Sequence, residues 1–206
     1  DCRLGVQTAS NQHNEKNYEF YWGDKNHILV DCISGLPICE LTTGANVSDS
    51  SVTLEILKKA NSFLPLAECS FLADKTYDVK VIYNTVHDTY NGDCFIDCCP
   101  CNHKCWNNGK KNRGCTKYIT LPDDYRLSID RSSIAFKSVY ALRTEAERYN
   151  SRFKQAGCES VFVRNGNSVK NLNTIAHISL LSIAIAAVIT KKDVSYRSVK
   201  TLKRLT

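Results

Sequence analysis

The sequence predicts an α/β domain in which helices flank a mixed β-sheet. Three observations support this fold class: a β-hairpin over residues 18–43, a short apolar strand over 71–74 that follows a helix, and a helical segment over 140–154. With 206 residues, 43% of them hydrophobic and 23% charged, the chain is long enough to bury a core. Its net charge of +6 permits binding to a polyanion but does not require it.

The first half of the chain contains the predicted hairpin. Residues 1–17 are polar and predict a loop or arm. From Tyr18 apolar and polar residues alternate, and 27–30 is an apolar run, which together predict a strand. A turn at 34–37 and a second strand at 38–43 follow. Residues 48–50 then offer a Ser or Asp as the cap of a helix that begins near Val52.

Residues 140–154 predict one continuous helix, because good helix formers dominate and Gly and Pro are absent. At about 100° per residue, one stripe of this helix carries polar side chains and another carries apolar side chains. The polar stripe is Tyr140, Arg143, Glu147 and Lys154, and the apolar stripe is Leu142, Ala146, Tyr149 and Phe153. The simplest interpretation is a surface helix with charge pairs such as Arg143 with Glu147.

The spacing Tyr-x2-Arg-x3-Glu-x6-Lys in this segment resembles the YREK signature of bacterial insertion-sequence transposases of the DDE type. The resemblance implies a ribonuclease-H-like mixed sheet flanked by helices. It also implies that Glu147 is the third metal-binding carboxylate of the active site. Arg143 and Lys154 would then contact DNA phosphates, with Tyr140 helping to position them.

Other stretches are similar to the same family and together cover nearly the whole chain. They are Tyr21-Trp22-Gly23-Asp24-Lys25, Leu29-Val30-Asp31, Ser34-Gly35-Leu36-Pro37, Ala45-Asn46-Val47-Ser48-Asp49-Ser50 and Ala73-Asp74-Lys75-Thr76-Tyr77-Asp78. An Asp after an apolar strand is more often a helix cap, but the resemblance makes Asp74 the second catalytic carboxylate. Asp24 and Thr76 stand where the family has Tyr and Gly, and Thr is expected to fit poorly at a position that favours Gly.

The reaction that the resemblance implies is hydrolysis and transesterification of DNA phosphodiesters with Mg²⁺ (or Mn²⁺) at Asp74 and Glu147. Such hard cations prefer carboxylate oxygens. The first Asp of the triad is expected upstream of this chain, because no strand is predicted in residues 1–17 and the sequence contains no Met. Asp1 and Asp31 are the fallback candidates, and Asp49 is interpreted mainly as a helix cap.

A cysteine-rich, basic segment separates Asp74 from Glu147. Cys98, Cys101, Cys105 and Cys115 have spacings that predict a four-sulfur zinc site, although the last two lie nine residues apart. The alternative is a set of reduced thiols in a degenerate insertion. The neighbouring Lys and Arg side chains and Trp106 would suit DNA, or would simply be solvated.

Residues 171–190 are free of formal charge and long enough to span a membrane, but interspersed polar residues favour a buried helix that covers the sheet. The predicted division of the chain is a first part of the core at 1–90, the Cys-rich insertion at 91–130, and the Glu-bearing helix, apolar helix and basic tail at 131–206.

Two alternative functions stay open beside the transposase prediction. One is a truncated or decayed transposase fragment that binds DNA without catalysis, and the other is a zinc-containing DNA-binding module. The expected partners are double-stranded DNA and a second copy of the chain on that DNA, with no membrane. The expected location is the bacterial cytoplasm, at the nucleoid.

Overall fold

The computed structural model describes residues 2–10, 16–97, 124–157, 162–163, 165–190 and 196–197. The chain forms two compact units. Unit 1 consists of Asp1–Pro65 and Thr144–Thr206, and unit 2 consists of Leu66–Arg143. Unit 2 is thus inserted in the sequence between the two segments that form unit 1.

Unit 1 is built on a three-stranded antiparallel sheet with the order β1-β2-β3. Its strands are β1 (Arg3–Ser10), β2 (Lys16–Val30) and β3 (Pro37–Gly44). The first half of the long β2 pairs with β1, and its second half, from Asp24 onward, pairs with β3. The predicted hairpin at 18–43 is therefore confirmed as β2 and β3.

The prediction of a loop or arm over residues 1–17 is wrong for Arg3–Ser10, which form β1. The expectation that no strand precedes the hairpin is wrong for the same reason. The polar composition concealed the strand, whose backbone groups are satisfied by pairing with β2. Gly5 allows β1 to approach the end of β3, because a Cβ at this position would lie 2.7 Å from Cβ of Ala45.

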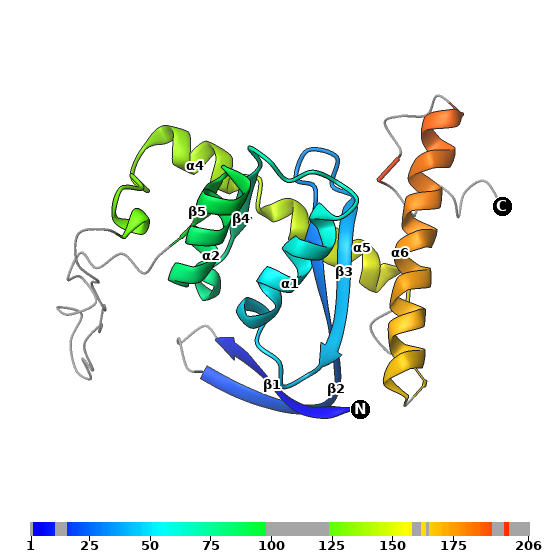
Figure 1. Ribbon diagram of the computed structural model, residues 1–206. Coiled ribbons are helices and arrows are strands. Elements are labelled where there is room, and N and C mark those ends of the chain that lie inside the picture. Colours follow the sequence, from blue (N-terminus) through cyan, green and yellow to red (C-terminus); the bar gives the residue numbers. More distant parts are fainter. Residues whose placement is uncertain are drawn as a thin grey trace. The chain divides into compact units, whose positions relative to one another are not determined.

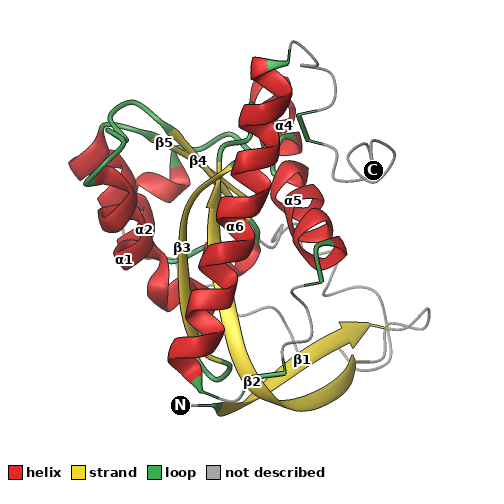
Figure 2. Ribbon diagram, turned by 90° about the vertical axis from the view of Figure 1, so that its right-hand side faces the viewer, coloured by secondary structure: helices red, strands yellow, loops and turns green. Residues whose placement is uncertain are grey.

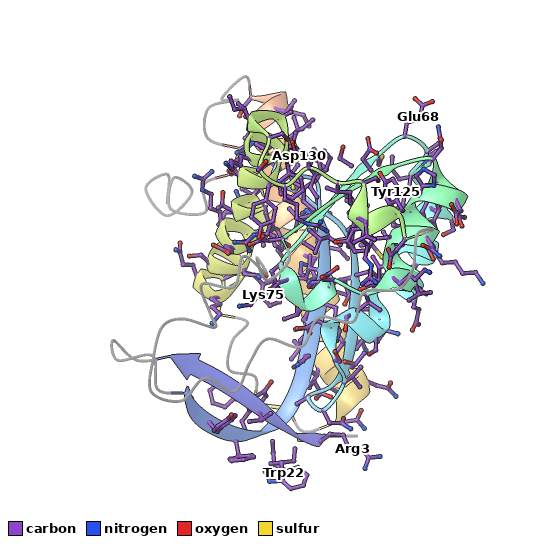
Figure 3. All side chains as sticks on the ribbon, turned by 90° about the vertical axis from the view of Figure 1, so that its left-hand side faces the viewer. Arg3, Trp22, Glu68, Lys75, Tyr125 and Asp130 are labelled. Atoms are coloured by element: carbon purple, nitrogen blue, oxygen red, sulfur yellow. The ribbon has the colours of Figure 1, made fainter. Side chains whose placement is uncertain are left out.

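One face of the β1–β2 ribbon is apolar and exposed. In the antiparallel register Leu4 lies opposite Trp22 and Val6 lies opposite Phe20. All four are exposed, as is Tyr18, and Figure 3 shows Trp22 projecting away from the ribbon. Alternation along a strand places such residues on one side of a sheet, so this side forms a continuous apolar strip.

Helices cover both faces of the β2–β3 part of this sheet. Figures 1 and 2 show α1 (Asp49–Asn61) on one side, and α5 (Thr144–Gln155) and α6 (Gly166–Ile189) on the other. Ile28 and Val30 of β2 pack against a cluster of buried α5 and α6 residues. The members of that cluster are Tyr149, Phe153, Ala176 and Leu180. His27, which points the other way, bonds to Asp49 of α1 at 3.1 Å.

Helix α1 begins at Asp49, three residues before the predicted start near Val52, and Ser48 is its N-cap residue, although the Ser48 side chain makes no capping hydrogen bond. Asp49, interpreted as a cap, is instead the first helical residue and pairs with His27 and with Lys25. The hydrogen bond from His27 outweighs the effect of burial, so the pKa of Asp49 lies below its usual range. Asp49 therefore ties α1 to β2.

Unit 2 contains two parallel strands, β4 (Ser70–Ala73) and β5 (Asp93–Ile96). A 3-10 turn η1 (Lys75–Tyr77), α2 (Lys80–Asn84) and a π turn η2 (Thr85–Thr89) connect them. A second 3-10 turn, η3 (Tyr125–Leu127), and α4 (Ile134–Ala141) complete the described part. The core includes Ile82, Tyr83 and Ile96, each with almost no exposed surface.

The single helix predicted over 140–154 is wrong. Helix α4 ends at Ala141, Leu142 and Arg143 form a turn, and α5 begins at Thr144. Phe136 of α4 packs against Phe95 in unit 2, with the two ring planes tilted, whereas Tyr149 and Phe153 of α5 are buried in unit 1. Each half of the segment is thus buried in the core of a different unit. Helix propensity depends on local sequence alone, so it did not predict the break between α4 and α5. Leu142, predicted on the apolar stripe, is 45% exposed.

Most of the apolar run at 171–190 lies in α6, which packs on β2 and β3 as predicted. The predicted burial is correct for one face only, because several isoleucines on the opposite face are exposed. His177 is buried, and its ring contacts Asn26 of β2 and the hydroxyl of Tyr149. By length and composition α6 also qualifies as a membrane span, but these criteria are met equally by core helices of proteins that enter no membrane.

Candidate active site

Asp74 directly follows β4, so its carboxylate lies at the carboxyl end of a strand. The side chain caps η1: Oδ1 accepts a hydrogen bond from the backbone amide of Thr76 at 2.7 Å. The hydroxyl of Thr76 donates a second bond to the same oxygen. The other oxygen, Oδ2, accepts no hydrogen bond from the described part of the chain, and Asp74 is exposed. Asp74 therefore presents one carboxylate oxygen to solvent.

Thr76 fits its position well, contrary to the expectation from the family's Gly. It lies within a 3-10 turn and is absent from the described residues with positive φ. A left-handed backbone, which would favour Gly, is therefore not required here. Its hydroxyl instead restrains the carboxylate of Asp74.

Asp97 is a second acidic residue at the same edge of the parallel pair, and the sequence patterns above did not single it out. Ala73 lies opposite Ile96 in the parallel register, so Asp74 and Asp97 follow neighbouring positions of β4 and β5. The carboxyl ends of parallel strands share one edge of a sheet, where ligands of α/β proteins commonly bind. The sequence carries the same signal for Asp97 as for Asp74, namely a short apolar strand followed by Asp. For Asp97 this signal lies directly before the cysteine-rich segment.

Tyr140 and Arg143 belong to unit 2 as well. The Phe136 ring packs against Phe95 of β5 in a tilted arrangement and stacks on Tyr140. The guanidinium of Arg143 lies 5.5 Å from the Tyr140 ring centre. Burial raises the pKa of Tyr140, Arg143 opposes this, and the charges of Asp97 and Asp74 raise it further. Tyr140 is thus a neutral hydrogen-bond donor within electrostatic range of both carboxylates.

Glu147 and Lys154 belong to unit 1, on the outer face of α5. Both are exposed, and because they are seven residues apart they project from the same side, about 10 Å apart along the axis. The buried face opposite carries Tyr149, Phe153 and Glu145. The five predicted site residues are therefore divided between the two units, with Asp74, Tyr140 and Arg143 in unit 2 and Glu147 and Lys154 in unit 1.

Glu145 and Asp31 are structural carboxylates of unit 1. Glu145 is 5% exposed and pairs with Arg148 and Arg197. Asp31 accepts hydrogen bonds from the amides of Ile33 and Ser34 and so closes the turn between β2 and β3. Both carboxylates are engaged in holding the fold, which gives Asp31 a local structural role.

Several parts of the sequence prediction lie outside the described residues, among them Trp106 with its basic neighbours and most of the basic tail, and two of them concern the candidate metal sites. One is the zinc site at Cys98, Cys101, Cys105 and Cys115, and the other is the fallback candidate Asp1. Within the described ranges, no three His, Cys, Asp or Glu side chains gather to hold a metal ion. Cys94, which precedes these cysteines in the sequence, is buried in β5, and burial raises the pKa of its thiol to about 12.

Comparison with known proteins gives one match. The family model of the transposase DDE domain matches residues 5–182, which include both strands that precede Asp74 and Asp97 as well as α5 and Glu147. No curated protein and no solved structure matches the chain. Because the match spans most of the sequence, the chain belongs to the transposase DDE domain family.

Proposed function

We propose that this chain is the catalytic domain of a DDE transposase that cleaves and joins DNA strands at the ends of an insertion sequence. The observation that carries the proposal is the family match across 5–182, together with an exposed carboxylate at the carboxyl end of β4. Water attacks phosphorus at the element's end and the O3′–P bond breaks. The freed 3′-hydroxyl then attacks a target phosphodiester in the same way.

The exposed carboxylates fit a divalent metal ion. Asp74 offers a free oxygen, and Glu147 is exposed on α5, so both can present the oxygen donors that Mg²⁺ or Mn²⁺ prefers. When bound, such ions stabilise the charge on the attacking and leaving oxygens. Asp74 by itself is not a complete metal site, so the proposal requires Glu147 and a further Asp to join it.

The remaining site residues act on the phosphate. Tyr140 keeps its proton at neutral pH, because burial and the two nearby carboxylates raise its pKa, and it can donate to a phosphate oxygen. Arg143 offers a planar fork suited to phosphate, and Lys154 offers a point charge. A function on chromosomal DNA places the protein in the bacterial cytoplasm.

A nicking assay on supercoiled plasmid DNA with Mg²⁺ or Mn²⁺ tests the proposal. We expect nicking by the transposase that contains this domain, its loss in Asp74→Asn and Glu147→Gln, and its retention in Asp88→Asn, an exposed Asp of unit 2. Metal-dependent nicking that survives Asp74→Asn would refute the assignment. Absence of nicking with retained, salt-sensitive DNA binding would favour the alternative of an inactive fragment.

A further inference from the structure

Helix α6 has two apolar faces on opposite sides. One face is buried on the sheet of unit 1 and includes Val169, Ala176, Leu180 and Ala184. The opposite face is exposed, and four isoleucines dominate it. Their exposed fractions are 58% for Ile175, 55% for Ile178, 59% for Ile185 and 74% for Ile189. A helix of unit 1 thus leaves a large apolar stripe uncovered by the described residues.

The exposed stripe has the spacing of a helix–helix contact. Ile175, Ile178, Ser182, Ile185 and Ile189 follow one another at intervals of three, four, three and four residues. This is the spacing of the a and d positions that form the seam of a coiled coil. Ser182 at the centre is small, and its hydroxyl donates a hydrogen bond to the carbonyl of Ile178 in the same helix. The Ser182 hydroxyl could therefore be buried in a helix–helix contact without losing its hydrogen bond.

The stripe is large enough to form the apolar centre of a specific contact. With Leu172 and Val188, which flank it and are 39% and 58% exposed, it presents apolar surface on the order of 600 Å². A stable protein–protein interface buries about 800 Å² on each partner, of which the central part is apolar. From Asn171 to Thr190 the helix carries no formal charge, so a second copy would meet no like-charge repulsion along this face.

The polar contacts of α6 disfavour a lipid environment. Asn173 donates to the hydroxyl of Thr42 at 3.0 Å, and Thr174 donates to the carboxylate of Glu40 at 2.8 Å. His177 adds its contacts with Tyr149 and Asn26. Insertion of α6 into a bilayer would either break these contacts or carry the charged Glu40 into the lipid. Both are unfavourable, because unpaired polar groups and charges are costly in the hydrocarbon core.

We propose that the exposed face of α6, from Ile175 to Ile189, is the contact between two copies of this chain. Each copy presents the same stripe to the other, with Ser182 at the centre, in an isologous pair. The pairing rests on the surface of unit 1 alone and does not depend on catalysis. It would join two copies of the domain through a helix on the side of the sheet opposite α1.

Sedimentation velocity of the 206-residue chain at about 50 μM, far above the micromolar Kd expected of a modest interface, tests this contact. We expect the wild type at twice the monomer mass of 23.2 kDa. The double variant Ile178→Glu/Ile185→Glu should sediment as a monomer. The matched control Ile134→Glu alters an isoleucine of α4 that is 84% exposed and should remain a dimer.

A second variant and a vesicle assay keep the test decisive. Ser182→Lys places one charge at the centre of the stripe and should also yield monomer. At a protein concentration below the dimer Kd its melting temperature should equal that of the wild type, because the position is exposed. A monomeric wild type, or a dimer that survives both sets of substitutions, would overturn the proposal. So would co-sedimentation with neutral phosphatidylcholine vesicles that the double variant loses, which would identify a membrane surface instead.

Discussion

Thr76 donates two hydrogen bonds, from its amide and from its hydroxyl, to one and the same oxygen of Asp74. The carboxylate is thereby held with its other oxygen directed to solvent. A residue that orients a metal ligand commonly affects metal affinity by about 10- to 100-fold. Thr76 thus positions the carboxylate of Asp74, and if Asp74 binds the proposed metal ion, the affinity for that ion depends on Thr76.

The first prediction concerns this pair. Thr76→Val keeps the shape of the side chain and the hydrogen bond from the backbone amide to Asp74 but removes the hydroxyl. Mn²⁺ affinity should therefore fall about tenfold, while the free energy of unfolding changes by less than about 1 kcal/mol. Thr76→Ser restores the donor and should retain affinity. Mn²⁺ titration by calorimetry, beside thermal melts, measures both. Equal Mn²⁺ affinity in Thr76→Val and wild type would remove the positioning role.

The second prediction concerns the turn between β2 and β3. Gly35 has φ of +69°, and a Cβ there would lie 3.0 Å from the carboxylate of buried Glu145. Gly35→Ala should therefore lower the free energy of unfolding by about 1–3 kcal/mol. Gly23→Ala is the control, because its Cβ would meet only the ring of Tyr21 at an ordinary 3.5 Å. Urea denaturation compares the two, and equal losses would show that the turn is not strained.

The third prediction concerns pH. Burial lowers the pKa of His177 below its ordinary value, and Glu40 only partly opposes this. The unfolded chain therefore binds a proton at this site more readily than the folded chain does. Stability should be highest above the ordinary His pKa of about 6.5 and should decline as the pH falls below it.

The variant His177→Phe isolates this contribution. It removes the titrating ring, so the decline in unfolding free energy between about pH 7.5 and 5.5 should become shallower than in wild type. Its stability above the His pKa should be lower, because the hydroxyl of buried Tyr149 loses its hydrogen bond with the His177 ring. An unchanged pH slope in this variant would assign the effect to other groups.

The fourth prediction concerns DNA binding. If Arg143 and Lys154 contact phosphates, Lys154→Ala and Arg143→Gln should each weaken binding to all sequences and reduce the salt slope of log K by about one. Lys154 is exposed, so its replacement should leave stability unchanged. Arg143 lies against Tyr140, and its loss should cost some stability. Lys58→Ala, an exposed cation of α1, is the control for net charge. Unchanged slopes in both variants would exclude a phosphate contact.

The distance between Asp74 and Glu147 stays a prediction. They belong to different units, and a shared metal site requires their carboxylates to come within roughly 10 Å, since the two ions lie about 3.5–4 Å apart. Pulsed electron resonance with Mn²⁺ and a spin label near Glu147 would measure the separation. A distance that places Glu147 far from the bound Mn²⁺ would contradict the triad.

Local patterns in the sequence determined several parts of this protein by themselves. The alternation after Tyr18 and the turn at 34–37 predicted β2 and β3, and the apolar run at 171–190 predicted α6. The strand that ends on Asp74 was also evident. Each depends on side-chain periodicity and turn chemistry within about twenty residues, which the sequence carries directly. The resemblance of this segment and of the other quoted stretches to DDE transposases predicted the family that the comparison shows.

Only the tertiary structure decided the features that depend on partners distant in sequence. Residues 3–10 become a strand because β2 lies beside them, although their composition predicts a loop. The helix predicted at 140–154 breaks after Ala141 because Phe136 and Tyr149 are fixed in different units. Asp97 joins Asp74 through the parallel register of β4 and β5. Pairing and burial are set by the whole chain, so no local pattern can report them.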